Sequence, residues 1–114
     1  MSVETFLEKL KASPESIAFS DTIAVIDENY NFQETAFTNG GTENGAGQNN
    51  GSCKIFAFGQ LNGLSEQQTL HCFGDYYRVD VLQNPEGDDH QNIRNFIEHG
   101  WGGIGFSGTA LALK

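Results

Sequence analysis

Basic residues are scarce in this chain, and their scarcity excludes several functions. The 114 residues include six Lys or Arg against 15 Asp or Glu, which gives a formal net charge of −9 at pH 7. Proteins that bind nucleic acids neutralise phosphates with clustered Lys and Arg, and anionic membranes attract the same clusters. Because six scattered residues cannot form such a cluster, we expect no nucleic-acid partner and no membrane partner.

Cysteines and long apolar runs are scarce as well. Two cysteines, Cys53 and Cys72, are too few for the disulfide framework of a small secreted domain, so we expect reduced thiols. The first residues show no positive charge followed by an apolar run and a cleavage site, so no signal peptide is expected. No stretch approaches about 18 consecutive apolar residues, as a membrane-spanning helix would need. These absences predict a cytoplasmic protein.

The fold class follows from length, periodicity and turn signals. One domain fits 114 residues, and two Pro against 14 Gly favour frequent turns over stiff linkers. We predict a single compact domain over residues 1–114, of the α+β class but predominantly α-helical, with about five helices and a short C-terminal β-hairpin. The expected helix starts are Ser2, Ser20 or Asp21, Ser52, the capping box at residues 65–68, and Asp88 or Asp89.

Apolar residues at helical spacing predict the core of this domain. The expected core residues are Phe6, Leu10, Ile23, Ile26, Ile55, Phe56, Phe58, Leu61, Leu70, Phe73, Tyr77, Ile93, Phe96 and Ile97. Residues 33–51 are rich in Gly, Asn and Gln and predict a long loop with one short strand at residues 35–38. The tail at residues 104–113 predicts the hairpin, with its turn at residues 107–108.

The most informative segment is residues 47–58 (GQNNGSCKIFAF), where a polar Gly and Asn run changes abruptly into an apolar one. A helix starting at Ser52 presents free N–H groups, the Cys53 thiol and the Lys54 ammonium at its positive end. Such an end can hold an anion, although water is the ordinary occupant. We expect residues 39–51 to form an ordered loop packed near the helix start at residues 89–94.

A thiol nucleophile is one hypothesis for this segment. Helix N-termini lower the pKa of a thiol, which makes Cys53 a weak candidate nucleophile with His90 as base and Asn92 as orienting group. His71 and His99 are rival bases. The alternative interpretation is an ordinary capped helix with a partly buried, unreactive Cys53.

Ligand binding is the other hypothesis for the same surface, because loops hold binding residues more often than scaffolds do. His90 and Arg94 are four residues apart and share a helix face. Trp101 lies among glycines and either stacks on a ligand or fills the core, and we favour the core. The candidate ligand-binding residues are Asn49, Asn50, Ser52, Lys54, His90, Arg94 and Trp101.

Metal and cofactor sites are not expected. His71 and Cys72 are adjacent, so on a helix their side chains diverge by about 100°. The cysteines and histidines lack the paired short spacings of zinc sites. The Gly47 loop is no P-loop, because no Gly-Lys-Ser/Thr follows it.

Short motifs in a fixed order extend along the whole chain: residues 37–40 (FTNG), 47–54 (GQNNGSCK), 63–65 (GLS), 73–78 (FGDYYR), 89–96 (DHQNIRNF), 100–101 (GW) and 104–106 (IGF). This ordered set resembles the HopJ family, whose members are called type III effector proteins. The resemblance covers essentially the whole chain. The resemblance implies a bacterial protein and suggests export through a type III apparatus. It implies no activity and no catalytic residue.

We therefore predict a non-enzymatic interaction protein that binds another protein or a small polar ligand at the junction of residues 39–51 and 89–94. The alternative is a thiol-dependent enzyme that uses Cys53 and His90. We expect a monomer or weak dimer in the bacterial cytoplasm, with secretion through a type III system as the alternative. Type III substrates typically begin with a poorly structured segment, whereas residues 2–12 predict a capped helix, which favours residence in the cytoplasm.

Overall fold

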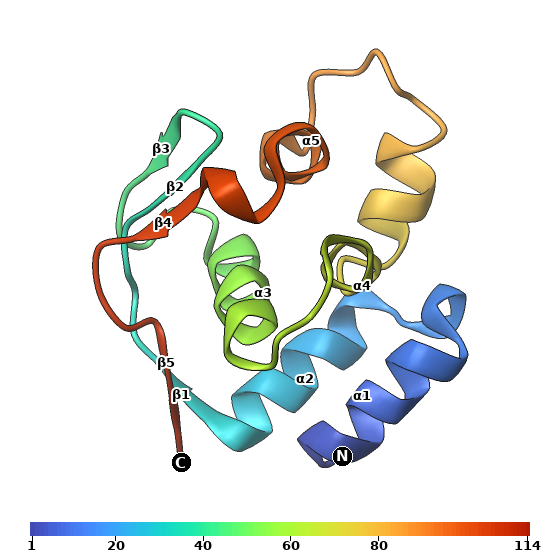
Figure 1. Ribbon diagram of the computed structural model, residues 1–114, viewed down its shortest axis with the longest axis vertical. Helices are drawn as coiled ribbons and strands as arrows, with labels where there is room; N and C mark the ends of the chain where they lie inside the picture. The colour runs from blue at the N-terminus through green and yellow to red at the C-terminus, as the bar shows by residue number, and fades with distance from the viewer.

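Helices and strands occupy different sides of the molecule (Figure 1). The computed structural model describes all residues, 1–114, and measures 36 × 31 × 21 Å along its principal axes. The helices are α1 (Val3–Ala12), the 3₁₀-helix η1 (Pro14–Ser16), α2 (Phe19–Asn29), α3 (Asn50–Leu61), α4 (Glu66–His71), the π-helix η2 (Tyr76–Val81), α5 (Gln91–His99) and the 3₁₀-helix η3 (Gly100–Gly103). The strands are β1 (Tyr30–Phe32), β2 (Phe37–Asn39), β3 (Thr42–Asn44), β4 (Ile104–Phe106) and β5 (Leu111–Leu113).

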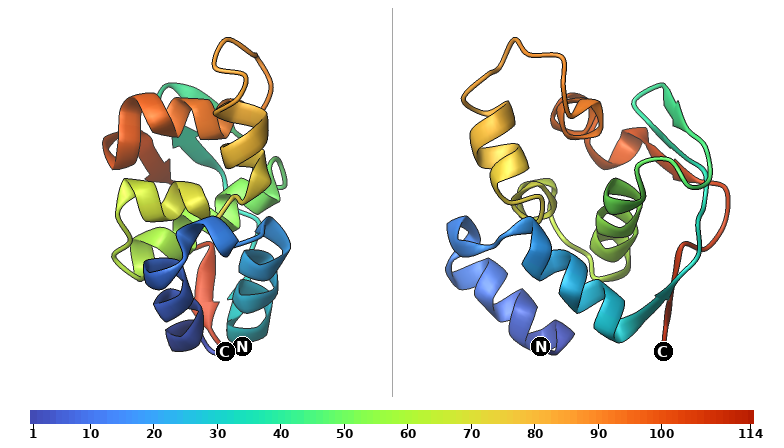
Figure 2. Two further views of the ribbon diagram at one scale, coloured as in Figure 1. Left: turned by 90° about the vertical axis from the view of Figure 1, so that its right-hand side faces the viewer. Right: turned by 180° about the vertical axis from the view of Figure 1, so that it is seen from behind.

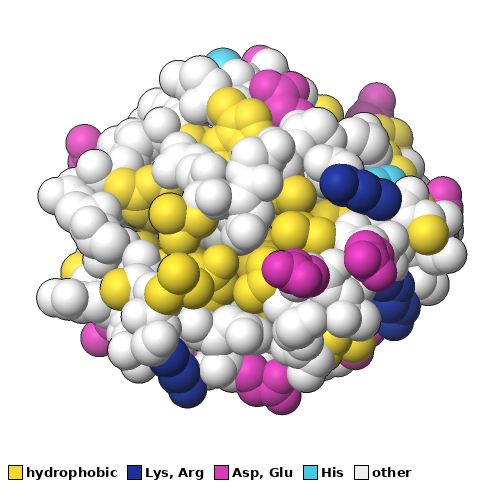
Figure 3. Space-filling model, turned by 60° about the horizontal axis from the view of Figure 1, so that its bottom comes forward, with side chains coloured by type: hydrophobic (Ala, Val, Ile, Leu, Met, Phe, Trp, Pro, Cys, Tyr) yellow, Lys and Arg dark blue, Asp and Glu magenta, His cyan; other side chains and the backbone are white.

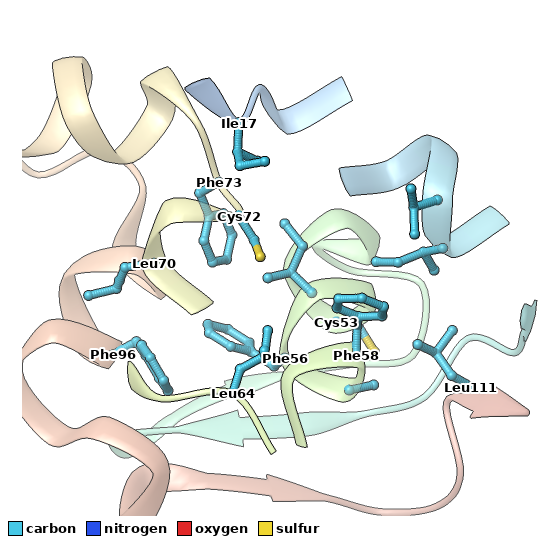
Figure 4. Packing of buried hydrophobic residues seen from close by; sticks show 14 of the residues in the cluster. Ile17, Cys53, Phe56, Phe58, Leu64, Leu70, Cys72, Phe73, Phe96 and Leu111 are labelled. Atoms are coloured by element: carbon cyan, nitrogen blue, oxygen red, sulfur yellow. The ribbon is translucent and has the colours of Figure 1, made fainter. Parts of the chain in front are cut away.

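Helix α3 lies at the centre because it is apolar around most of its circumference. Ile55, Phe56 and Phe58 are fully buried. The Phe56 ring meets four other aromatic rings at centroid distances between 5.0 and 6.5 Å, and Figure 4 shows Phe56 packed between Phe96 and Phe73. Edge-to-face and tilted aromatic pairs add to the free energy of burial. The remaining elements therefore assemble around α3.

Several predicted helix ends are confirmed. The Ser2 hydroxyl accepts a hydrogen bond from the Thr5 N–H, and Ser65 and Gln68 form the reciprocal capping box. Gly100 ends α5 in a left-handed conformation, with φ of 63°. Helix α2 begins slightly earlier than predicted, at Phe19, because the Asp21 carboxylate accepts the N–H of Ala18 rather than capping its own helix.

The helix predicted after Ser65 is broken into two parts. Helix α4 ends at His71, and Gly74 turns the chain with φ of 62° before the π-helix η2. A side chain at Gly74 would meet the backbone, since a Cβ there would lie 2.6 Å from the Phe19 nitrogen. The predicted apolar seam nevertheless faces inward, because Leu70 and Tyr77 are both buried on either side of the turn.

The predicted C-terminal hairpin is wrong. Strand β5 pairs with β1, whereas β4 pairs with β2 in the sheet β3-β2-β4, and all of these pairs are antiparallel. The turn between β4 and β5 therefore sends the two strands to different sheets. Residues 33–51, predicted as a loop with one strand, contain the β2–β3 hairpin, and Gly40 and Gly41 supply its positive φ angles.

Most of the predicted core is buried, but Leu61 and Ile97 are exposed by 58% and 47%. Leu61 is the last residue of α3, where the helix leaves the core, and Ile23 is only partly buried. Buried residues outside the prediction include Ile17, Val25, Phe37, Cys72 and Leu111. None of the helices is long and apolar enough to cross a membrane.

Candidate functional site

A cavity of about 380 Å³ opens where the N-termini of α3 and α5 meet strand β3 and the aromatic side chains of α2 and η2. Its lining contains no Asp, Glu, Lys or Arg. The residues around it are Phe19, Thr42, Asn44, Asn49, Gly51, Ser52, Phe73, Tyr76, His90, Gln91, Asn92 and Ile93. The cavity is therefore aromatic on one side and rich in amides on the other.

Four asparagines join the elements behind the cavity. Asn44 and Asn92 exchange two side-chain hydrogen bonds, at 3.3 and 3.1 Å, across β3 and α5. Asn39 donates to the Asn92 carbonyl at 2.8 Å, and Asn49 donates to Asn44 Oδ1 at 2.8 Å. Amides that hydrogen-bond to one another fix the relative positions of their elements, and only Asn39 Oδ1 is buried without a partner. The expected packing of residues 39–51 near the α5 start is confirmed.

Both helices that end at the cavity have N-cap residues in the left-handed region. Asn49 and His90, with φ of 53° and 50°, are the only non-glycine residues with positive φ, and neither side chain caps its helix. This backbone also corrects two predicted starts. Helix α3 begins at Asn50 rather than Ser52, and α5 begins at Gln91 with His90, not Asp88 or Asp89, as its N-cap residue. The backbone N–H groups of Gly51, Ser52, Gln91 and Asn92 donate to no acceptor in the chain.

His90 stands at the rim between the cavity and two carboxylates. Its Nε2 lies 3.1 Å from Asp80 Oδ2 and 3.8 Å from Asp89 Oδ2. The imidazole ring also packs on Tyr76, with centroids 5.1 Å apart. These contacts hold the ring against the aromatic wall of the cavity.

Cys53 lies outside the cavity, in the core beside α3's buried phenylalanines (Figure 4). The thiol is 1% exposed and its sulfur lies 3.5 Å from the Thr35 carbonyl oxygen, whereas no histidine is hydrogen-bonded to it. Burial raises the pKa of Cys53, and burial raises the pKa of Cys72 to about 12. Because desolvation by burial is the largest effect, the pKa of Cys53 is raised, not lowered as the sequence predicts.

The structure brings together Asn49, Ser52, His90 and Asn92 among the candidate residues, but Lys54 and Asn50 point elsewhere. Lys54 Nζ lies 2.9 Å from Asp27 Oδ1 and 5.0 Å from the centre of the Phe32 ring. Asn50 donates to Glu34. Neither lines the cavity, because the first turn of α3 distributes successive side chains around the helix.

Arg94 and Trp101 also lie outside the cavity. Arg94 pairs with Asp89 at 2.6 Å and donates to the Asn84 carbonyl at 2.9 Å, so it fastens the loop before α5. The Trp101 indole N–H donates to the Leu64 carbonyl at 3.0 Å, and its ring packs on Phe96 with centroids 5.0 Å apart. Trp101 is thus partly buried against the core.

Sequence reasoning offered Tyr76 at a pocket rim as the alternative to a structural role, but it did not place Phe19 or Phe73 at the cavity. Phe19 and Tyr76 pack edge to face with centroids 5.0 Å apart, although 57 positions separate them in the sequence. Phe73 was predicted only as core. The charged residues on either side of Tyr76 and Tyr77, Asp75 and Arg78, were the one available signal. No group of three or more His, Cys, Asp or Glu side chains is placed to hold a metal ion.

Comparisons with known proteins place the chain in a family. No curated protein matches it. A crystal structure described as a protein of unknown function, VPA0580, is 58% identical and superposes with a TM-score of 0.99, covering 100% of this chain and 95% of that one. The model of the HopJ type III effector protein family matches residues 3–111. Because this match spans nearly the whole chain, the protein belongs to the HopJ type III effector protein family.

Proposed function

We propose that this protein is a non-enzymatic binding protein whose site is the cavity between α3 and α5. The proposed ligand is a small polar molecule that presents hydrogen-bond acceptor oxygens. The observation that supports this most is the convergence of two helix N-termini with four free backbone N–H groups, at Gly51, Ser52, Gln91 and Asn92, on one cavity. Free N–H groups at a helix start attract acceptors, and the helix dipoles add to this attraction.

The residues that line the cavity narrow the class of ligand further. Phe19, Tyr76 and Ile93 supply apolar surface beside the amides, so a ligand with a small apolar part gains burial there. The lining carries no fixed charge, and the chain as a whole is negative. Salt screens charges beyond about 8 Å at physiological ionic strength, and the carboxylates at the rim, Asp80 and Asp89, contact His90. Carboxylates and carboxamides both fit this description.

The absence of a nucleophile beside a base supports binding over catalysis. Cys53 is buried with a raised pKa, and Ser52, which shares the cavity with His90, makes no hydrogen bond to it. Nucleophilic catalysis requires such a pair. The thiol-enzyme alternative therefore has no geometric support at Cys53.

Saturation-transfer NMR with three minimal probes tests this function. Acetate and acetamide both present acceptor oxygens, whereas methylammonium presents only donors. We expect saturation transfer to acetate and acetamide and none to methylammonium. A Ser52→Tyr variant fills the cavity from the half-buried first turn of α3, and Gln60→Tyr is its matched control on the exposed far end of the same helix. Equal transfer in both variants would contradict the site.

Location is a separate proposal. Export through a type III system is the location that the family's description suggests. We favour residence in the bacterial cytoplasm, because Ser2 and α1 form a capped helix packed on the domain from the third residue onward. A reporter fused after Tyr30 separates the two locations. Secretion of the fusion, abolished in a strain that lacks the type III apparatus, would overturn residence.

A further inference from the structure

The sheet β3-β2-β4 has an open edge at β4. Strand β4 pairs with β2 on one side and with no strand on the other (Figure 1). In an antiparallel ladder, every second residue directs its N–H and C=O groups away from the partner strand. Ser107, just after β4, donates its N–H to the Ala36 carbonyl of the β2 side, which fixes this alternation. The residues of β4 whose backbone groups point away from β2 are therefore Ile104 and Phe106.

Most of these outward backbone groups lack a partner. The N–H and C=O of Phe106 and the C=O of Ile104 make no hydrogen bond in the chain, whereas the Ile104 N–H donates to the Trp101 carbonyl. A row of free backbone groups on an edge strand is a template for another extended chain. Charged residues, Pro and bulges commonly protect such edges, and β4, with the sequence Ile-Gly-Phe and a continuous register, contains none of them.

A second cavity, of about 660 Å³, opens on the same sheet and is larger than the one between α3 and α5. Its lining includes Glu43, Thr38 and Gly105, which are paired across β3, β2 and β4 in one row and are all exposed. Because Gly105 has no side chain, the way from the β4 edge into this cavity is open. A Cβ at Gly105 would lie 3.0 Å from the Thr38 hydroxyl oxygen. Glycine inside a strand often marks a site that a ligand or another backbone approaches closely.

The charge of this cavity indicates what enters it. Glu43 is the only ionisable side chain in its lining. None of the ion pairs of the chain includes Glu43, so its carboxylate has no counter-ion. A side chain that reaches Glu43 from the β4 edge crosses Gly105 and Thr38, and the long aliphatic stem of Lys or Arg suits this path while the cationic head stays in water. The cavity is therefore complementary to a cationic side chain that comes from the β4 edge.

Other exposed surfaces do not indicate the chemistry of a partner in this way. The face in Figure 3 shows hydrophobic side chains near its centre, and both Lys or Arg and Asp or Glu at its margin. Such a mixed margin favours neither a basic nor an acidic partner. The three-stranded sheet and α1 lie on opposite sides of the molecule (Figures 1 and 2), so α1 does not cover the β4 edge.

We propose that the open edge of β4 binds an extended segment of a partner protein as a further antiparallel strand, with a Lys or Arg of that segment opposite Gly105. The residues on either side of this cation lie opposite Ile104 and Phe106 and hydrogen-bond to their free backbone groups. The pair at Gly105 is then of the narrow kind, with Cα atoms about 4.5 Å apart, which brings the cationic side chain over the bare glycine toward Glu43.

The residues that flank the cation are apolar, because the side chains of Ile104 and Phe106 are partly buried hydrophobics that pack against the core. Successive side chains of a strand alternate between its two faces, so one segment supplies both the cation and its apolar neighbours. None of Ile104, Gly105 and Phe106 lines the cavity between α3 and α5. This proposal is therefore independent of the proposed function.

The test uses a capped peptide, Ser-Thr-Val-Arg-Val-Thr-Ser, and follows amide hydrogen exchange and ¹H–¹⁵N NMR resonances of the protein. The Phe106 N–H has no acceptor in the chain, so the peptide should shift its resonance and slow its exchange. The Gly105 N–H faces Thr38 and should be protected with and without peptide. A peptide N-methylated at both valines keeps the charge but cannot donate to the β4 edge, and it should not bind. A peptide with glutamate in place of arginine should bind more weakly than the arginine peptide.

Two pairs of variants test the path to Glu43, with affinity measured by fluorescence anisotropy of the labelled peptide. Gly105→Val suits a strand but closes the path, and it should weaken binding by about tenfold or more. Gly102→Val is the matched control, because Gly102 is exposed and no atom lies within 4 Å of the position of its Cβ. Glu43→Gln should weaken binding about threefold at low salt, whereas Glu8→Gln, an exposed carboxylate on α1, should leave it unchanged.

An unmoved Phe106 amide at millimolar peptide would overturn the proposal. Equal binding of the N-methylated or glutamate peptide would also overturn it, as would affinity of Gly105→Val within about twofold of the wild type. Acetate binding in the cavity between α3 and α5 would persist in all of these outcomes if the proposed function holds.

Discussion

At the scale of single residues, the two cysteines give the sharpest contrast between the sequence and the structure. Cys72 has a pKa raised to about 12 by burial. At pH 8 its thiolate fraction is therefore on the order of a thousandfold below that of a free thiol with the ordinary pKa of 9.0. We expect both Cys53 and Cys72 to resist iodoacetamide in the native protein and to react fully in urea, as measured by mass spectrometry. Native alkylation of Cys53 at the rate of free cysteine would restore the thiol-enzyme hypothesis.

His71 predicts a pH dependence of stability. Burial and the neighbouring Arg78 lower its pKa, and Glu15 partly opposes them. The folded state then binds fewer protons than the unfolded state as the pH falls through the unfolded value of 6.5, so the free energy of unfolding decreases with acidification. Urea titrations at about pH 7.5 and pH 5.5 measure this decrease. His71→Gln, which cannot titrate, should show a smaller decrease, and an equal one would remove His71 as its source.

At the scale of elements, the turn at Gly74 separates α4 from η2. Gly74 and Gly63 have nearly the same positive φ, 62° and 63°, but only Gly74 has backbone atoms within 4 Å of the position that an alanine Cβ would take. Gly63→Ala should therefore cost about 1 kcal/mol for the left-handed backbone alone. Gly74→Ala adds the clash with Phe19 and should cost about 3 kcal/mol or more, measured by urea denaturation. Equal losses would show that this close approach is not essential.

Local signals predicted those elements whose ends depend on adjacent residues. The capping side chains of Ser2 and Ser65 act within three positions, so the sequence alone contains them. The C-terminal strands depend on distant partners, since β5 pairs with β1 and β4 with β2. Residues 107–108 have turn composition, but turn composition does not specify which strand pairs with which.

At the scale of the whole molecule, the position of the candidate site was predictable but its lining was not. The polar excess at residues 39–51 and 89–94 indicated the junction, and the hydrogen bonds between Asn44 and Asn92 confirm that these segments meet. The ion pair of Lys54 with Asp27 and the aromatic wall formed by Phe19 and Tyr76 depend on tertiary packing. The spacing of residues within one segment contains no information on the Lys54 contacts or on the aromatic wall.

The proposed binding site is tested most directly by the amide resonances of Gly51, Ser52, Gln91 and Asn92 in a ¹H–¹⁵N correlation spectrum during an acetate titration. These N–H groups belong to two helices and have no acceptor in the chain. A ligand that accepts hydrogen bonds in the cavity should shift all four together, with one shared dissociation constant, and Ser52→Tyr should abolish the shifts while Gln60→Tyr preserves them. Four unmoved resonances at saturating acetate would contradict the account.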